Sequence, residues 1–182
     1  MRQLVFSVLV LSLSLLSACS GVTVRDYTQI QPTLIMEQFF DGPLRAAGVV
    51  KNFNGRVIRT FTADIKAYWR EGVGTLEEDF NFDDGERQRR VWTLQPDGSG
   101  GYLGSAGDVV GESLIEVSGN SVFLDYVLRV PYGDSSLDLH IDDRMYLVSP
   151  DLIINESVMR KFGIKVGEIL LTIYRPSTSA GA

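Results

Sequence analysis

Short groups of turn-forming residues recur at close intervals through the middle of the chain. Asn-Gly and Asp-Gly pairs between apolar segments are typical of β-hairpins, because glycine and asparagine tolerate the positive φ angles of tight turns. The intervals leave no room for the roughly 30 residues of a β-α-β unit. The spacing therefore predicts consecutive antiparallel strands rather than a parallel sheet. The turn signals are Asn54-Gly55, Asp84-Gly85, Pro96-Asp97-Gly98, Gly119-Asn120 and Pro131-Tyr132-Gly133-Asp134.

Two of these turns separate apolar from polar side chains when each is treated as a two-residue turn. One apolar face and one polar face are what a half-buried hairpin requires. Around Asn54-Gly55 the apolar face pairs Leu44 with Ile65 and Ala46 with Ala63, and the polar face pairs Arg45 with Asp64. Around Gly119-Asn120 the apolar face pairs Val117 with Val122 and Ile115 with Leu124.

The hairpin around Asp84-Gly85 favours a three-residue loop, Asp83-Asp84-Gly85, in which Gly85 is left-handed. A two-residue turn would place Phe80 and Phe82 opposite arginines. The longer loop instead gathers the apolar residues Leu76, Phe80, Phe82 and Trp92 on one face. The same register places Glu78 directly opposite Arg90, and it predicts that this charged pair faces inward.

Together these hairpins predict an all-β fold, an antiparallel up-and-down barrel of about eight strands, because sequential strands usually close to hide their edges. A short helix or 3-10 plug is expected over residues 33–40. A second short helix, capped by Asn155 and covering residues 156–162, is expected before the last strand. The expected strands are 44–53, 56–69, 74–82, 86–95, 109–118, 121–130, 137–148 and 164–175, with short pieces at 101–105 and 152–155.

The N-terminus has the pattern of a bacterial lipoprotein signal. A basic start is followed by thirteen mostly apolar residues, 4–16, too few for a membrane-spanning helix of about 20 residues but typical of a signal peptide. Leu16-Ser17-Ala18-Cys19 then matches the lipobox, and Cys19 is the only cysteine of the chain. Cys19 is thus the predicted lipidation site. The alternative is an ordinary signal peptide with an incidental cysteine.

This signal sets the expected organisation of the chain. Residues 1–18 are the signal peptide, 19–33 the acylated cysteine and a tether, 34–175 a single β-barrel domain, and 176–182 a disordered tail. Ser20 stands where aspartate would signal inner-membrane retention in enterobacteria. The predicted location is therefore the outer membrane, with the barrel facing the periplasm and the lipid on Cys19 as the membrane contact.

Several motifs make the chain similar to a family of lipoproteins from Gram-negative bacteria, catalogued as domain of unknown function 3833. The resemblance covers nearly the whole mature chain and implies a lipocalin-like, or calycin, barrel. It also suggests an association with fatty-acyl-chain modification, and it supplies no catalytic residues. The motifs are the lipobox, FFDG at 39–42, FNGRVIRTF at 53–61, LEEDFNFDDGERQRRVW at 76–92, GSAGDVVG at 104–111, DDRMYLV at 142–148 and MRKFGIKVGEI at 159–169.

Composition and motif spacing argue against several functions. Seventeen basic and 23 acidic residues give a net charge of −6, which disfavours nucleic acid as a partner. One cysteine and one histidine leave little material for a metal site, and we expect neither metal nor cofactor. Gly104-Ser105-Ala106-Gly107 has the wrong spacing for a nucleophile elbow, and His140 lies on the polar strand face. No catalytic residue is predicted.

The expected interior is apolar with a few polar groups, which is the usual character of a ligand site. Arg90 or Arg59 could receive a carboxylate or phosphate. Alternatively, Glu78 and Arg90 neutralise each other in a filled core, or lie at a wet end of the barrel. The candidate ligand-binding residues are Glu78, Arg90, Trp92, Arg59, Tyr126 and Asp143.

Three functions remain open. The first is binding of a small apolar or lipid ligand, such as a fatty acid or related acyl compound, in the bacterial envelope. The second is a structural or assembly role through the outer surface, with a protein partner that the sequence does not identify. An enzyme acting on acyl chains comes third.

Overall fold

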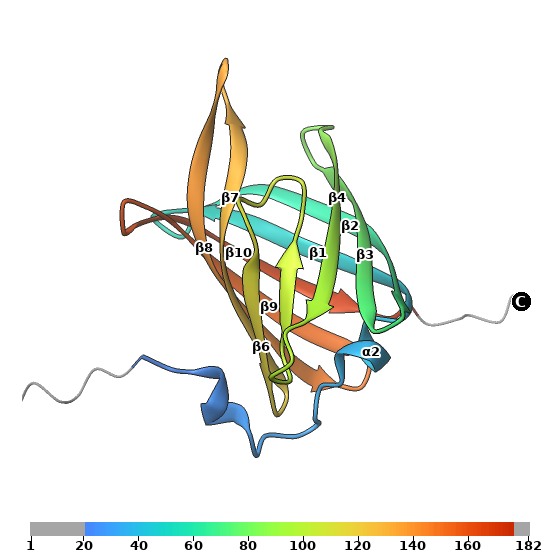
Figure 1. Cartoon of the computed structure of the whole chain (residues 1–182). Helices are drawn as coiled ribbons and strands as arrows, with labels where there is room; N and C mark the ends of the chain where they lie inside the picture. Colours follow the sequence, from blue (N-terminus) through green and yellow to red (C-terminus); the bar gives the residue numbers. More distant parts are fainter. Residues whose placement is uncertain (1–20, 177–182) are drawn as a thin grey trace, which may run out of the picture.

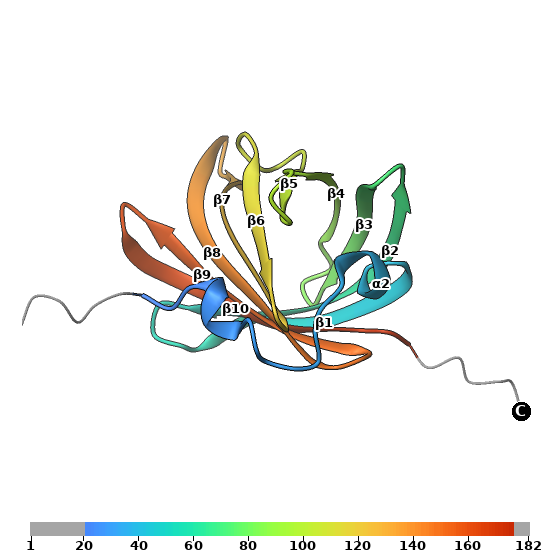
Figure 2. The same ribbon diagram turned by 60° about the horizontal axis from the view of Figure 1, so that its bottom comes forward.

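The computed structural model describes residues 21–176, and its ten antiparallel strands close into one barrel (Figures 1 and 2). Each strand pairs with its neighbours in sequence, and β1 pairs with β10 to complete the ring. The strands are β1 (Gly42–Asn52), β2 (Val57–Arg70), β3 (Val73–Phe82), β4 (Arg87–Pro96), β5 (Tyr102–Ser105), β6 (Ser113–Ser118), β7 (Ser121–Tyr132), β8 (Ser135–Ser149), β9 (Leu152–Lys161) and β10 (Ile164–Tyr174).

This architecture confirms the predicted all-β, up-and-down barrel, but with ten strands rather than eight. One addition is the short strand β5, which had been expected only as a minor piece at 101–105. The stretch predicted as a strand over 109–118 is a strand only from Ser113, because residues 106–112 form a loop that lies beside β7, in the gap between β4 and β7.

The other addition is β9, which contains the short piece expected at 152–155 and corrects the predicted helix over residues 156–162. This segment pairs with β8 on one side and β10 on the other. In an extended strand alternate residues point the same way, so Ile153, Asn155 and Ser157 all face inward and are buried. A helix would have spread these three side chains around its circumference.

The predicted register holds at all three hairpins. Gly119-Asn120 is a two-residue turn between Ser118 and Ser121. The loop at Asn54-Gly55 has three residues rather than two, closed by a hydrogen bond of 2.9 Å from the Asn52 N–H to the Arg56 carbonyl. A bulge beyond Val50 compensates for the extra residue and restores the predicted pairs from Leu44 to Val50.

The Asp84-Gly85 hairpin has the predicted three-residue loop. Gly85 is left-handed, with φ at 88°, and the Phe82 N–H donates to the Glu86 carbonyl at 3.0 Å. Glu78 stands opposite Arg90 in the β3–β4 ladder. The register argument from the four apolar residues was therefore correct.

One end of the barrel is closed by a short helix, α2 (Met36–Phe39), as the sequence predicted. The residue after it, Phe40, is almost fully buried. Its carbonyl accepts a hydrogen bond of 2.8 Å from the Trp69 indole N–H. From the other end of the chain, the Arg175 guanidinium donates to the carbonyls of Phe39 and Asp41, both at 2.9 Å. The plug is thus fastened by hydrogen bonds to the barrel and to the C-terminal segment.

The segment expected to be a tether is ordered where the structure describes it. Residues 24–27 form a 3-10 helix, η2 (Val24–Tyr27), that packs against β6 and β7. Val24 is buried, and the Tyr27 ring lies 5.6 Å from that of Phe123. Cys19, the signal peptide and almost all of the predicted tail lie outside the described residues. No helix in residues 21–176 is both long and apolar enough to cross a membrane.

Candidate ligand-binding cavity

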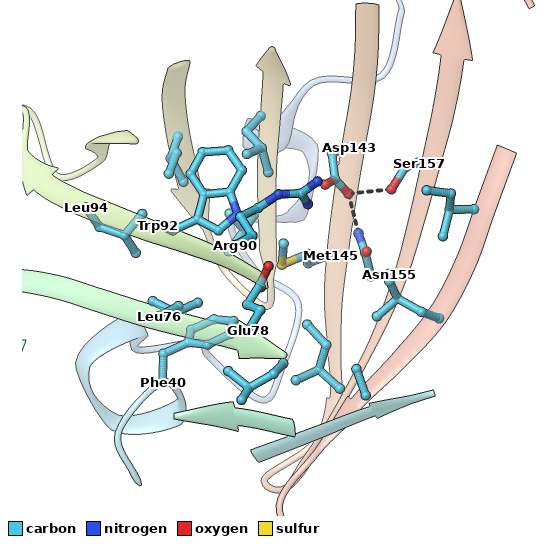
Figure 3. A pocket seen from close by; sticks show the side chains of 18 of the residues that line it. Phe40, Leu76, Glu78, Arg90, Trp92, Leu94, Asp143, Met145, Asn155 and Ser157 are labelled. Atoms are coloured by element: carbon cyan, nitrogen blue, oxygen red, sulfur yellow. Dashed lines mark hydrogen bonds between the residues drawn. The ribbon is translucent and has the colours of Figure 1, made fainter. Parts of the chain in front are cut away.

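The inward-facing side chains leave a cavity of about 120 Å³ inside the barrel (Figure 3). Pockets that enclose drug-sized ligands measure roughly 300–1,000 Å³, so this one suits a small molecule or one end of a longer molecule. Most of its lining is apolar. Its polar lining residues are Glu78, Arg90, Tyr126, Asp143, Asn155 and Ser157.

Asp143, on β8, is a polar group of the cavity that side chains of the neighbouring strand hold by hydrogen bonds. Its carboxylate accepts hydrogen bonds from the Asn155 side-chain amide and, at 3.0 Å, from the Ser157 hydroxyl, both on β9. The Tyr126 hydroxyl lies at 3.5 Å. Burial raises the pKa of Asp143 to about 6, and the bonds from Asn155 and Ser157 oppose this rise.

Glu78, on β3, faces the cavity without a polar partner. Among the described residues no side chain forms a hydrogen bond or ion pair with its carboxylate, which points into the cavity in Figure 3. Burial raises the pKa of Glu78 to about 7, against the opposing attraction of Arg90. Near neutral pH this carboxyl can therefore either donate or accept a hydrogen bond.

Arg90, on β4, binds the loop of residues 106–112, which lies in the gap between β4 and β7. Its guanidinium donates three hydrogen bonds of 2.7–3.0 Å to the Asp108 carboxylate. Burial acts to lower the pKa of Arg90, but the hydrogen bonds to Asp108 and the nearby acidic groups of Tyr126, Glu78 and Asp108 together outweigh it, and the pKa is raised. One cation thus lies among three carboxylates, those of Asp108, Glu78 and Asp143.

Two aromatic side chains complete the polar region of the cavity. Trp92 and Tyr126 meet edge to face, with ring centroids 5.4 Å apart and an interplanar angle of 86°. Burial raises the pKa of the Tyr126 hydroxyl well above its usual value, so this hydroxyl stays protonated and available as a hydrogen-bond donor.

The barrel wall has a gap in its strand pairing beside Arg90, which we call the seam. β4 pairs with β5 only over its last four residues, and the rest of its length faces the loop of residues 106–112. That loop is held to β7 by a bridge from Val109 to Leu128 and by the Arg129 N–H, which donates to the Asp108 carbonyl at 2.8 Å. An outer cleft of about 610 Å³ lies along this seam, and it shares Phe80 and Arg90 with the inner cavity.

Five of the six predicted ligand-binding residues line the inner cavity: Glu78, Arg90, Trp92, Tyr126 and Asp143. Arg59 does not. Its guanidinium stacks 3.6 Å from the centre of the Phe82 ring and donates to Asp84 and Glu86 at 2.7 and 2.6 Å. Arg59 therefore stabilises the loop between β3 and β4, because it lies near the end of β2 that is next to this loop.

Sequence reasoning missed Asn155, Ser157 and Asp108. The first two alternate with the apolar Ile153, which is a strand signal that the predicted helix obscured. Asp108 carries no such signal, because it sits in a loop whose path depends on tertiary contacts.

Other chemistry-bearing groups are few in the part of the chain that the structure describes. No cluster of three or more histidine, cysteine, aspartate or glutamate side chains there could hold a metal ion. The His140 Nε2 lies 3.3 Å from an Asp125 carboxylate oxygen, and both side chains are well exposed. This pair lies on the solvated outer face, as predicted for His140.

Comparison with known proteins supports the fold. No curated protein matches. Among solved structures, a protein of unknown function from the DUF3598 family of Nostoc punctiforme aligns with a TM-score of 0.58 and 16% identity, over 80% of this chain and 51% of that chain. The chain thus spans about half the length of that protein. At this identity the likeness shows the fold alone.

Two further structures align less well. The S-type phycobiliprotein lyase CPES from Guillardia theta gives a TM-score of 0.48 and 16% identity, over 80% of this chain and 94% of that chain. EF1p2_mFAP2b bound to DFHBI gives 0.45 and 10%, over 78% and 100%.

The family assignment rests on a match along almost the whole length. The barrel agrees with the lipocalin-like fold that the sequence resemblance implied. The chain belongs to the family described as "Protein of unknown function (DUF3833)", whose model matches residues 13–175.

Proposed function

We propose that the barrel binds a small apolar ligand, such as a fatty acid or a related acyl compound, in the bacterial envelope. In this proposal the lipid on Cys19 holds the protein at the outer membrane, facing the periplasm. The observation that carries the proposal is the group of polar side chains lining an otherwise apolar cavity, above all the unpartnered Glu78.

A barrel whose interior served stability alone would not need these polar side chains in the cavity lining. Burying a charged or polar side chain without a partner is unfavourable, commonly by a few kcal/mol. Leucine or methionine at position 78 would avoid that penalty. Glu78 is half-buried and lines the cavity. A carboxyl without a partner in such a place is instead typical of a group whose partner is a ligand.

The charges around the cavity constrain the ligand's polar end. Because Asp108 already occupies Arg90, an incoming carboxylate meets Glu78 and Asp143 rather than a free cation. It binds best when Glu78 is protonated and donates a hydrogen bond to it. An alcohol or amide end can use the same residues without a change of charge.

The seam beside Arg90, where β4 lacks a paired strand, offers a route into the cavity. Phe80 and Arg90 separate the outer cleft from the interior. Movement of the loop that carries Asp108 would open this seam without unpairing the longer strands. The same movement would free Arg90 for a ligand's carboxylate.

The test uses the full chain in lipid nanodiscs, with empty nanodiscs as a blank, and hexanoate, hexanol and hexylamine as probes. Native mass spectrometry first shows whether a small molecule accompanies the purified protein. Calorimetry at pH 6 and pH 8 then measures affinity. We expect hexanoate to bind about tenfold more weakly at pH 8, because Glu78 is then mostly ionised and the competent fraction falls by that factor.

Glu78→Gln should remove the part of this pH dependence that comes from position 78, since its amide is always able to donate, and leave only the part that comes from ionisation of Asp143. Glu77→Gln is the matched control, because Glu77 lies on the outer face and bonds to Tyr68 and Arg89. Hexylamine should show the opposite pH trend. If none of the three probes binds and no molecule accompanies the protein, ligand binding is excluded.

A structural role in the envelope is the second candidate. The specific observation in its favour is the volume of about 120 Å³, which is below the usual range for ligand pockets. It predicts no binding of the probes and a protein partner on the outer face of the barrel.

A further inference from the structure

We infer that the ends of the β1–β2 and β9–β10 hairpins form a contact site for an anionic lipid surface. Large apolar side chains are strongly exposed there: Phe162 is 91% exposed, Ile164 71%, Phe53 66% and Ile58 61%. A single exposed apolar residue is ordinary, but several gathered at one place mark an interaction surface.

These residues lie together because of the ring closure. β1 pairs with β10, with Asn52 opposite Gly167, so the loop after β1 lies beside the first residues of β10. In both ribbon views the two hairpin ends project on the same side of the barrel (Figures 1 and 2). Residues 51–58 and 159–168 therefore form one surface, which we call the double tip.

The double tip is basic although the protein is acidic. It contains Lys51, Arg56, Arg160, Lys161 and Lys165 but only one acidic residue, Glu168, which leaves it at +4 within a chain of net charge −6. Glu168 bonds to both Lys51 and Lys165. Among the described residues Arg56 and Arg160 have no ion-pair partner, so their charges face outward uncompensated.

Apolar tips surrounded by basic residues are the combination that a lipid surface of negative charge recognises. Phenylalanine and isoleucine enter the boundary between headgroups and acyl chains, while lysine and arginine reach the phosphates. Lys161 combines both properties, since its ammonium group lies 4.9 Å from the centre of the Phe162 ring. A protein partner of acidic surface could also use the charges, but it would not require unsupported aromatic tips.

The place where the described N-terminal segment begins agrees with this assignment. The described part of the N-terminal segment begins on the same side of the molecule as the double tip in both ribbon views. It starts at Gly21, two positions after Cys19. The inference does not depend on the cavity, and it holds whether or not the barrel binds a ligand.

The experiment places a new tryptophan on the tip. The full chain with Phe162→Trp is reconstituted in vesicles of phosphatidylcholine and phosphatidylglycerol whose acyl chains carry bromine, which quenches tryptophan inside the bilayer. Tyr132→Trp is the matched control, because Tyr132 is 71% exposed at the end of a different hairpin, β7–β8, which projects in another direction in Figure 1. The native Trp69 and Trp92 belong to the barrel interior and give a common background.

We expect the tryptophan at position 162 to lose at least half of its emission, and the tryptophan at position 132 to lose little. Replacing phosphatidylglycerol by phosphatidylcholine, or introducing Arg56→Glu with Arg160→Glu, should at least halve the quenching at position 162. Equal quenching at the two positions would overturn the inference, and so would quenching that is indifferent to lipid charge. A dimer in lipid-free detergent solution that Phe162→Ser abolishes would assign the surface to a second copy instead.

Discussion

Glu78 and Arg90 stand directly opposite each other on β3 and β4, but no ion pair joins them. Arg90 instead donates all three of its bonds to Asp108, from a loop that the ladder does not include. Arg90 thereby fastens this loop over the gap beside β4, and Glu78 is left facing the cavity. Two residues that face each other across neighbouring strands therefore have different roles. Arg90 holds the loop against β4, and the Glu78 carboxyl has no hydrogen-bond partner among the described residues.

The stability of the protein should fall as the pH rises from about 4.5 to 7. The folded-state pKa of Glu78, about 7, lies above its unfolded value of 4.5. The folded state therefore binds more protons in that interval, and the linkage relation gives a decline with rising pH. Asp143 contributes in the same direction up to its pKa of about 6.

Glu78→Gln should therefore raise the free energy of unfolding at pH 8 by about 1–3 kcal/mol and flatten its pH dependence. Urea unfolding of the full chain at pH 5, 6, 7 and 8 measures this. Glu77→Gln should instead weaken the protein at pH 8, because hydrogen bonds from Tyr68 and Arg89 lower the pKa of Glu77. A Glu78→Gln variant with an unchanged pH profile would show that the carboxyl is well hydrated.

Arg90→Met should destabilise the protein by about 1–3 kcal/mol, because it leaves the Asp108 carboxylate without its charged donor. Adding Asp108→Asn should recover much of this loss. Urea unfolding of the two single variants and the double variant supplies the comparison. Arg89→Met, next in sequence but on the outer face and exposed, should have a smaller effect. Additive losses in the double variant would contradict a direct coupling between Arg90 and Asp108.

Gly119→Ala should loosen the N-terminal segment from the barrel. A Cβ at this position would lie 1.8 Å from the Tyr27 carbonyl oxygen, and φ is 56°. Gly133 has the same φ of 56° with nothing nearby, so Gly133→Ala reports the backbone strain alone. We expect Gly119→Ala to cost about 1–3 kcal/mol more than Gly133→Ala, and to speed proteolysis within residues 21–33. Equal effects of the two variants would mean that η2 yields without loss.

Cys19→Ser should abolish acylation, because no other residue of the chain can form the thioether. The readout is incorporation of labelled palmitate during expression in a Gram-negative host, together with fractionation of the membranes. Ser17→Thr, a change just before the cysteine that leaves the acceptor in place, serves as the control. Palmitate labelling of the Cys19→Ser variant at the level of the native chain would refute the lipobox interpretation.

Much of the barrel was determined by local sequence. The turns at Gly85 and Gly119 require positive φ angles that few other residues adopt, and these turns set the register of their hairpins. Once the register was set, the alternation of strand residues decided which side chains face inward. Glu78, Arg90 and Trp92 could be assigned to the interior for this reason, and so could Asp143 and Tyr126.

Tertiary structure decided what those inward residues contact. Asp108 reaches Arg90 through a loop without periodicity, so no pattern in the sequence could pair the two. The segment around Asn155 has both a capping residue and an alternating pattern. Only pairing with β8 and β10 selected the strand, because edge hydrogen bonds on both sides stabilise it more than one isolated helical turn would. The interior of a barrel depends on strands far apart in sequence, and their mutual placement is set by ring closure rather than by any local signal.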